Sequence, residues 1–366
     1  MEDIQKYNLL ENEVIQSRLG SITYLKSDIG ITEHGSIHFE DKTLLANYIY
    51  NESSYNLVYT IVDPEGNVVD SFIEKEGILP ILFKSPVNEI YVSITPYDPD
   101  KEMEISIPLF NRSLVEKAKL NRPFSGKYIG TVNQSAILYD IDIWSEKKPD
   151  KMLNIEFKNN QIKKKTNIKI DFPKDNKINI HDNEIHLIAR ENDIFIHRLI
   201  DETGREIRSR KVNHKEFFIR EVIKLSFDDT STLIHGEDDG KFMLLEIDNK
   251  GKISAKELIN IQDEIFNTWP PVEIAEDTVV IRFNTEFGNG WFTLYQDKLI
   301  EFFYGKDIQE YKNLLTNEIF EIDRNDLVIA SINKTKDNSY AVIFYPMADG
   351  ERKNKELIIL NRTIAG

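Results

Sequence analysis

A hairpin motif that recurs along the chain constrains the fold more than any other feature. Each copy is an apolar run of strand length, a tight turn of the form Asp-x-x-Gly, and a second run. Three copies are clear, at Leu57–Phe72, Ile194–Val212 and Phe242–Ile259. Aspartate favours such turns because its carboxylate bonds the local backbone, and glycine supplies the positive φ that other residues resist. The chain is therefore expected to consist of repeated antiparallel hairpins.

The turn glycines give the period of this repeat. Gly66, Gly204, Gly251 and Gly350 are separated by 138, 47 and 99 residues. These separations are three, one and two steps of roughly 46–49 residues, a period typical of propeller blades. Hairpins that fill the gaps are predicted at Ile107–Val115, Leu153–Ile162 and Trp291–Ile300. The spacing therefore predicts seven units.

Each unit is predicted to contain four strands. The fifth unit shows them most clearly, at Ile219–Phe227, Ser231–His235, Phe242–Ile247 and Lys252–Ile259. The second strand of a unit is apolar or alternating, as expected for a strand buried between neighbouring sheets. These second strands are predicted at Ile90–Ile94, Ile137–Trp144, Ile185–Ala189, Val279–Phe283 and Leu327–Ile332.

The repeated strand–Asp-x-x-Gly–strand hairpins resemble those of seven-bladed β-propellers across nearly the whole chain. The Trp-Asp signature of WD repeats and the glycine doublets of kelch repeats are absent, so the resemblance is one of architecture. It implies an all-β, seven-bladed β-propeller of four-stranded antiparallel blades, with a central channel that binds something at one end. Because a fold does not dictate a function, that last implication is an analogy.

The N-terminal segment is predicted to be a short amphipathic helix. Apolar residues recur there at helical spacing, at Ile4, Tyr7, Leu10, Val14 and Ile15. The domain prediction is a helical extension over residues 1–19, packed on the body or docking another protein, and one propeller over residues 20–366. Closure has two alternatives: Lys355–Leu360 is the outer strand of the last unit, or a segment near Ile22–Leu25 pairs into that unit.

Composition excludes several classes of site. The chain has 366 residues, no cysteine and a formal net charge of −16. The lack of cysteine removes disulfides, thiol catalysis and cysteine-based zinc sites, and it is compatible with a reducing compartment. The negative charge argues against nucleic acid, which needs a concentrated basic face. No apolar run approaches the roughly 20 residues of a transmembrane helix, so a cytoplasmic protein with no membrane partner is predicted.

Two loops look briefly like ligand sites. Gly236–Lys241 is one residue short of a phosphate loop, and its three acids would repel phosphate, so it is predicted to join two strands. Tyr97–Glu102 carries alternating acids, but Met103 and Leu109 stand where an EF-hand needs glycine and glutamate. No cofactor is predicted, and a looser Ca²⁺ site at this second loop is the one alternative.

The histidines are not predicted to bind metal. His34 and His38 lie four apart on a predicted strand, where they are separated by about 13 Å, too far to share an ion. His186 and His197 lie on neighbouring strands and are expected to approach each other. No hydrolase, zinc-protease or dinucleotide-binding motif occurs. Because propeller enzymes assemble sites from single residues on different blades, this absence is weak evidence against catalysis.

One binding face emerges from the repeat itself. In a propeller, the loops that join second to third strands all lie at the same end. In this chain those loops are acidic in six of seven units, at Asp98, Asp100, Glu146, Asp150, Glu191, Asp193, Glu237, Asp238, Asp239, Glu286 and Asp337. Trp269 adds an aromatic side chain to the predicted face. Such acids would focus a negative potential toward a basic partner, although exposed loops are often charged without any such role.

The predicted function is therefore a non-catalytic scaffold that holds a protein or peptide, basic in character, on this acidic loop face. The alternative is a hydrolase or lyase acting on a sugar or lactone, with carboxylates at the channel mouth. Paired carboxylates about 5–10 Å apart would favour the enzyme.

Overall fold

The computed structural model describes residues 11–17, 20–26, 31–39, 42–51, 54–63, 68–75, 78–87, 90–95, 102–106, 114–119, 126–140, 151–158, 161–169, 176–191, 194–213, 218–236, 239–306, 310–321, 327–346 and 356–364. Every regular element within these ranges is a β-strand, which confirms the all-β class. None of these segments forms a helix with the length and apolarity needed to cross a bilayer.

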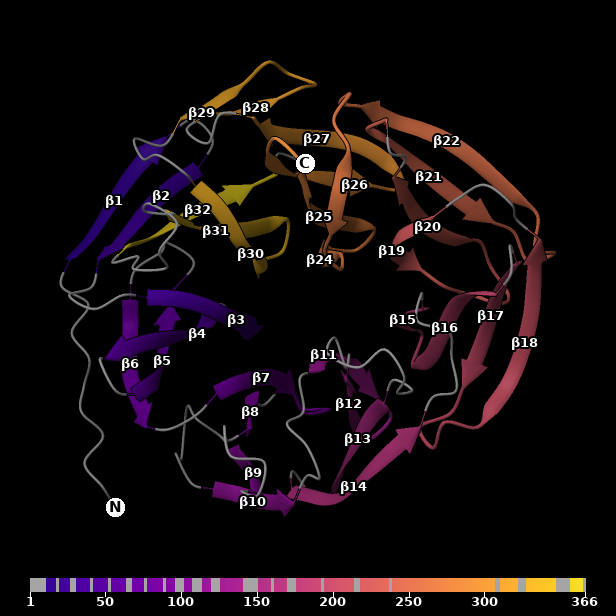
Figure 1. Ribbon diagram of the computed structural model, residues 1–366, viewed down its shortest axis with the longest axis horizontal. Coiled ribbons are helices and arrows are strands. Elements are labelled where there is room, and N and C mark those ends of the chain that lie inside the picture. Colours follow the sequence, from indigo (N-terminus) through magenta and orange to yellow (C-terminus); the bar gives the residue numbers. More distant parts are fainter. Residues whose placement is uncertain are drawn as a thin grey trace. The chain divides into compact units, whose positions relative to one another are not determined.

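The described strands group into two compact units. The first contains residues 1–80 and 263–366, and the second contains residues 81–262. In both units the strands form antiparallel sheets whose members follow one another closely in sequence, except for one sheet of the first unit, which joins strands from the start of the chain to strands from its end (Figure 1).

The second unit holds four sheets of four strands each. One is formed by β7 (Ile78–Lys84, which begins in the first unit), β8 (Ile90–Thr95), β9 (Glu102–Ser106) and β10 (Leu114–Lys119). The next is formed by β11 (Gly126–Val132), β12 (Ser135–Asp140), β13 (Lys151–Lys158) and β14 (Gln161–Lys169). Then come β15 (Asn176–His181), β16 (Glu184–Glu191), β17 (Ile194–Ile200) and β18 (Glu206–Asn213). The last contains β19 (Ile219–Lys224), β20 (Ser231–Gly236), β21 (Lys241–Ile247) and β22 (Ile253–Asn260).

The first unit holds one sheet of four strands and two larger ones. The four-stranded sheet contains β3 (Ile31–Phe39), β4 (Lys42–Asn51), β5 (Ser54–Val62) and β6 (Val68–Lys75). The seven-stranded sheet contains β23 (Ile265–Thr268), β24 (Val272–Ala275), β25 (Thr278–Thr285), β26 (Asn289–Tyr295), β27 (Lys298–Gly305), β28 (Glu310–Asn313) and β29 (Ile319–Glu321). The five-stranded sheet runs in the order β1 (Glu11–Ser17), β2 (Gly20–Lys26), β32 (Glu356–Thr363), β31 (Ser339–Pro346) and β30 (Leu327–Lys336).

The Asp-x-x-Gly turns form for the predicted reason. At the β21–β22 turn, Asp248 Oδ1 accepts hydrogen bonds from the backbone N–H groups of Lys250 at 2.9 Å and Lys252 at 2.8 Å. The bond from Lys252 is the main reason that the pKa of the Asp248 carboxyl is lowered. Gly251 adopts φ 81°, which favours glycine. Asp201 makes the same kind of turn between β17 and β18.

The core lies between sheets. In the first unit, Trp291 stacks on Phe303 with ring centroids 4.7 Å apart, and its Nε1–H donates to the hydroxyl of Tyr340 in the neighbouring sheet at 3.0 Å. All three side chains are at most 1% exposed. Comparable apolar clusters in the second unit join β11–β14 to β15–β18, and β15–β18 to β19–β22.

The predicted N-terminal helix is wrong where the structure can test it. Residues 11–17 form β1, which pairs with β2 over its whole length; residues 1–10, 18 and 19 lie outside the described part. A short isolated helix is marginal in water, whereas a strand here completes the hydrogen bonds of β2.

The pairing of β2 with β32 answers the closure question. Their register runs from Ser21↔Asn361 to Lys26↔Glu356, so a segment near the start of the chain joins the sheet made by its last strands. In Figure 1 the indigo β1 and β2 lie beside the yellow end of the chain. Of the two alternatives, the segment that includes Ile22–Leu25 therefore pairs into the last unit.

Two expectations about the repeat need correction. Four strands per unit is wrong for two sheets, because β1 adds a fifth strand to one and the β28–β29 hairpin extends the other. The repeat predicts Leu327–Ile332 as a second strand, but β30 stands at the end of its sheet and is the first. Gly350 therefore lies between β31 and β32, the second and third strands of this sheet, in sequence. The fourth strand of the sheet is β2, which comes from the start of the chain.

Candidate functional site

Most of the predicted acidic face lies outside the described residues. This holds for Asp98, Asp100, Glu146, Asp150, Asp193, Glu237 and Asp238. Glu191 is the last residue of β16, and only its backbone is described. The described side chains of the predicted face are those of Asp239, Trp269, Glu286 and Asp337.

Two of these acids are paired with lysines. Asp239, between β20 and β21 as predicted, lies 2.6 Å from Lys241 Nζ. Asp337 lies 2.6 Å from Lys334 Nζ. Asp337 also sits in the turn between β30 and β31, the first two strands of its sheet. That turn is at the opposite end of β31 from the connection to β32, so its assignment to a second-to-third loop is wrong.

Trp269 is not at the loop end either. Its backbone N–H donates to the carbonyl of Arg282 at 3.0 Å, partway along β25. The Arg282 guanidinium lies 3.6 Å from the centroid of the half-buried Trp269 ring. Since Glu286 lies four positions after Arg282 along an extended chain, about 13 Å separates Trp269 from the predicted loop.

Among the predicted loops that the structure describes in full, the one at Glu286 carries an exposed aromatic side chain. It lies in the β25–β26 turn beside Phe287, which is 59% exposed. The backbone N–H of Glu286 donates to the carbonyl of the exposed Glu264 at 3.3 Å. Phe266, 46% exposed, is in β23 where that strand pairs with the end of β25. We call Glu264, Phe266, Glu286 and Phe287 the aromatic–acidic end of the β23–β29 sheet.

A buried polar cluster fixes the backbone beneath this end. Thr285 Oγ1 accepts from the backbone N–H of Gly288 at 3.0 Å and contacts the Tyr304 hydroxyl at 2.7 Å. That hydroxyl donates to Asp263 Oδ2 at 2.7 Å, and Lys306 Nζ lies 2.7 Å from the same oxygen. Burial opposes ionisation of Asp263, but the bonds from Lys306 and Tyr304 outweigh it and lower the pKa of its carboxyl. The turn that carries Phe287 is therefore rigidly supported.

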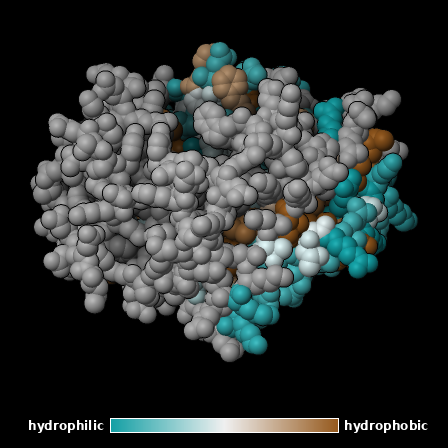
Figure 2. Space-filling view, turned by 60° about the horizontal axis from the view of Figure 1, so that its bottom comes forward, coloured by the Kyte–Doolittle hydropathy of each residue, from teal (hydrophilic) through white to brown (hydrophobic). Residues whose placement is uncertain are grey.

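The surface of the described part is mixed rather than uniformly polar. In the view of Figure 2, brown hydrophobic patches lie among teal hydrophilic ones. Large apolar side chains that are exposed in the β23–β29 sheet are Phe266, Phe287, Tyr295, Leu314, Leu315 and Ile319. Exposed aromatic residues at a structured site are a common feature of interfaces.

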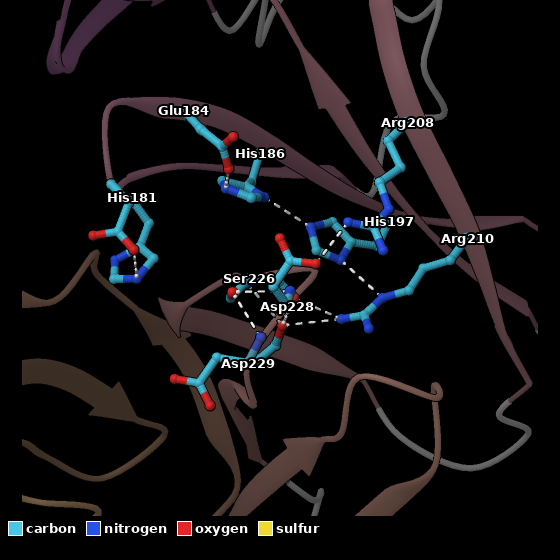
Figure 3. Close-up of polar contacts among 11 residues, drawn as sticks. His181, Glu184, His186, His197, Arg208, Arg210, Ser226, Asp228 and Asp229 are labelled. Carbon is cyan, nitrogen blue, oxygen red and sulfur yellow. Dashed lines mark hydrogen bonds and ion pairs between the residues drawn. The ribbon is translucent and has the colours of Figure 1, made fainter.

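The second notable cluster is a pair of buried histidines in the second unit (Figure 3). His186 Nδ1 and His197 Nε2 are 3.0 Å apart, which confirms that these side chains approach across β16 and β17. Each is 1% exposed. Arg210 Nε donates to His197 Nδ1 at 3.2 Å. Burial, followed by Arg210, lowers the pKa of His197 to about 2, and burial with His181 lowers that of His186 to about 4.

This histidine cluster does not have the parts of a catalytic or metal site. Ser226, the one hydroxyl-bearing residue labelled in Figure 3, accepts from the backbone N–H groups of Asp228 at 3.3 Å and Asp229 at 3.1 Å, so its oxygen stabilises a turn. Within the described residues, no three His, Asp or Glu side chains are grouped so that they could hold a metal ion. The cluster connects the β15–β18 sheet to the β19–β22 sheet through hydrogen bonds, as a buried polar network does.

Comparison with known proteins bears on the fold. No protein-family model matches the chain, and no curated protein matches it. Among solved structures, the β-propeller domain of the Trilobed protease from Pyrococcus furiosus is similar over 93% of this chain and 97% of that one, with 9% identity and a TM-score of 0.52. The chain has a β-propeller fold.

Other similar structures do not narrow the function. A virginiamycin B lyase from Staphylococcus aureus is 11% identical, with a TM-score of 0.50 and coverage of 97% and 99% of the two chains. A protein from Lactobacillus plantarum is 9% identical, with a TM-score of 0.52 and coverage of 89% and 96%. At these identities the likeness extends to the fold alone.

Sequence reasoning missed the two exposed phenylalanines. Phe266 stands in a run that reads as an ordinary strand, where an aromatic residue suggests core. Phe287 had a usable signal: it lies in Thr-Glu-Phe-Gly-Asn-Gly, and a phenylalanine in a glycine-rich turn has no sheet face to bury it.

Proposed function

We propose that this β-propeller is a non-catalytic scaffold that binds a protein or peptide through the loops that join second to third strands. The proposed partner carries basic and apolar side chains. We further propose that the propeller predicted over residues 20–366 is one domain to which β1 also belongs, with one blade for each of the sheets described above. We also propose a cytoplasmic location, which the lack of cysteine supports.

The observation that carries this proposal is the aromatic–acidic end. Two exposed phenylalanines and two exposed glutamates lie on a supported turn and the adjacent strand. Aromatic side chains supply large apolar area at low entropic cost and dominate binding energy at interfaces. The carboxylates add attraction for a cationic partner and speed its encounter. None of these four side chains is needed to close the core.

Truncating the aromatic anchors is expected to abolish most binding. Peptide arrays that vary in lysine, arginine and aromatic content supply the probe, and the best peptide is titrated by fluorescence anisotropy. Phe287→Ser is expected to weaken binding about tenfold or more, as for a central interface residue. Tyr295→Ser is the matched control, because Tyr295 is 45% exposed at the opposite end of β26. Equal affinities for the two variants would refute the assignment of this end.

Neutralising the carboxylates is expected to change the salt dependence of binding. Glu264→Gln with Glu286→Gln should weaken binding about two- to tenfold at low ionic strength and flatten its dependence on salt, because exposed charges are screened. Replacing Glu237, Asp238 and Asp239 by their amides tests the predicted loop of the preceding repeat in the same way. Unchanged binding at low salt in both variants would show that the acids play no part.

The enzyme alternative is an outcome of the same work. A chain that binds no peptide in the array but turns over a sugar or lactone in a substrate screen would make the hydrolase or lyase prediction the better one. In that case a carboxylate pair about 5–10 Å apart should be required for turnover.

A further inference from the structure

The buried histidine pair has a single consistent arrangement of protons. The guanidinium of Arg210 can only donate, so His197 Nδ1, 3.2 Å from Arg210 Nε, must accept. The proton of neutral His197 is then on Nε2, where it is donated to His186 Nδ1 at 3.0 Å. The proton of His186 is in turn on its own Nε2, 3.3 Å from Glu184 Oε2 in a contact that does not reach hydrogen-bond geometry. The chain of donors therefore runs from Arg210 through His197 to His186 (Figure 3).

A further proton has no favourable place in this chain. On His197 it would go to Nδ1, which faces the N–H of Arg210. On His186 it would go to Nδ1, which faces the N–H of His197. Either event sets two donors against each other and places a cation in a buried site close to Arg210. Burial and this cation are the causes that lower the pKa of His197.

The acidic groups around the pair offset this cost only in part: Asp182 raises the pKa of His186, but burial and the nearby cations outweigh it. The charged groups come from every neighbouring element: His181, Asp182 and Glu184 on β15–β16, Arg208 and Arg210 on β18, Lys224, Asp228 and Asp229 at the β19–β20 turn, and Asp248 at the β21–β22 turn. Asp228 is 2.9 Å from Arg208, and Asp229 is 2.6 Å from Lys224. Glu184 Oε2 lies 3.3 Å from His186 Nε2, but the Glu184 side chain is 50% exposed, so water screens its charge.

Arg210 also holds the next sheet. Its guanidinium donates to the backbone carbonyls of Asp248 at 3.0 Å and Ser226 at 2.8 Å, and to Ser231 Oγ at 3.2 Å. Asp248 is in the β21–β22 turn, and the two serines flank the β19–β20 turn. Phe227, in that same turn, stacks on His197 with centroids 4.0 Å apart. The Arg210 guanidinium therefore links β18 to two turns of the neighbouring sheet by hydrogen bonds. His197 orients this guanidinium through its own hydrogen bond to Arg210 Nε.

We propose that His186, His197 and Arg210 form an acid-released latch between the β15–β18 sheet and the turns of the β19–β22 sheet. While both imidazoles are neutral, the donor chain orients Arg210 and the turns stay attached. When either imidazole takes a proton, the chain breaks, like charges meet, and the turns detach from β18. Histidine is suited to such a device because its ordinary pKa lies within the pH range of cells. This inference is independent of the proposed binding function.

The direction of the pH effect follows from linkage. The folded protein holds both imidazoles neutral, whereas they titrate near 6.5 once the latch is open. The stabilising effect of the latch is therefore complete above pH 6.5 and declines as the pH falls toward about 4 for His186. Each histidine should raise the open population about tenfold per pH unit in that window, which corresponds to 1.4 kcal/mol per unit.

The test uses the wild-type chain between pH 7.5 and 4.5. Long-range ¹⁵N–¹H spectra of the histidines should show two that remain neutral with the proton on Nε2 at pH 6. Amide exchange, corrected for the intrinsic effect of pH, should accelerate at residues 226–231 and 248–252 by well over tenfold, and up to about a hundredfold, per pH unit below 6.5, because two histidines each contribute about tenfold. Seven histidines that all titrate near pH 6.5, or turns whose corrected exchange does not respond to acid, would overturn the proposal.

Two variants assign the effect to the latch. His186→Phe keeps a ring beside Phe227 and removes one titrating group, so the acceleration per pH unit should fall to about the tenfold expected for a single histidine. His181→Gln is the control, because His181 is partly exposed and outside the donor chain. An acid response that persists unchanged in His186→Phe and disappears in His181→Gln would contradict the assignment. Should His186→Phe fail to fold, the wild-type spectra still decide.

Discussion

Replacing Arg362 by methionine is expected to destabilise the protein by about 3–5 kcal/mol. Arg362 on β32 is 9% exposed and Glu301 on β27 is 7% exposed, so the ion pair between them is buried between two sheets of the first unit. Arg362 Nε donates to Glu301 Oε1 at 2.8 Å, and the Tyr340 hydroxyl donates to Oε2 at 3.0 Å. Methionine preserves the apolar stem but leaves the carboxylate without its cation. The loss of unfolding free energy is measured by chemical denaturation, from the shift in midpoint between variants that share the same dependence on denaturant concentration.

A second variant separates lost charge from lost packing. In Arg362→Met with Glu301→Gln, no buried charge remains, and the amide oxygen can still accept from Tyr340. Removing one partner of a buried ion pair is costly mainly because the other charge remains buried without compensation. The double variant should therefore recover a large part of the lost stability. A single variant that costs less than about 1 kcal/mol, or a double variant no more stable than the single, would show that the pair does not hold these sheets together.

Replacing Gly20 by alanine is expected to be comparably severe and to act on the joining of β2 to β32. Gly20 has φ 143°, and a Cβ built on it would lie 1.8 Å from the backbone oxygen of Asn361. The oxygen belongs to a paired strand, so the backbone itself must shift. Backbone strain alone costs of order 1–3 kcal/mol, and the displaced strand adds to it. Faster amide exchange over residues 20–26 and 356–363 would locate the damage.

Gly251→Ala is the matched control for this experiment. Gly251 has a similarly positive φ of 81°, but the nearest atom to an added Cβ is 3.6 Å away, an ordinary contact. Gly251→Ala should therefore show the free-energy cost of placing alanine at a positive φ without the steric clash that an added Cβ makes at Gly20. If the two variants are equally stable, the close approach at Gly20 is not what limits substitution there.

The local part of the fold was predictable from the sequence because its causes are local. Asp248 and Gly251 determine a turn through bonds that reach four residues, and the two flanking runs can only pair with each other. The approach of His186 and His197 follows from strand order in the same way.

The non-local part was not predictable. Hydrogen bonds from β2 to β32 join residues more than 300 positions apart, and nothing in the sequence near Ile22 distinguishes a strand that pairs forward from one that pairs with the last sheet. The added β28–β29 hairpin lengthens the β23–β29 sheet and displaces the next sheet along the sequence. A fixed period carried past this insertion therefore assigns Asp337 to the wrong turn.

The sequence predicted an acidic residue of the candidate site, Glu286, but not its exposed phenylalanines. Glu286 could be found because loops are polar and the repeat places them. Phe266 and Phe287 were missed because hydrophobic patterns indicate core, and exposure depends on tertiary neighbours. The role of Arg210 in the histidine cluster was also invisible, since its partners Ser226 and Asp248 lie on turns of another sheet.

The most direct test of the binding account is an amide-exchange footprint of the protein with and without the best array peptide. The account predicts protection at residues 264–268 and 285–289, the aromatic–acidic end, and no change at the Tyr295 end of the same sheet. Protection confined to other sheets, with Phe287 and Phe266 as exchangeable as in the free protein, would contradict it.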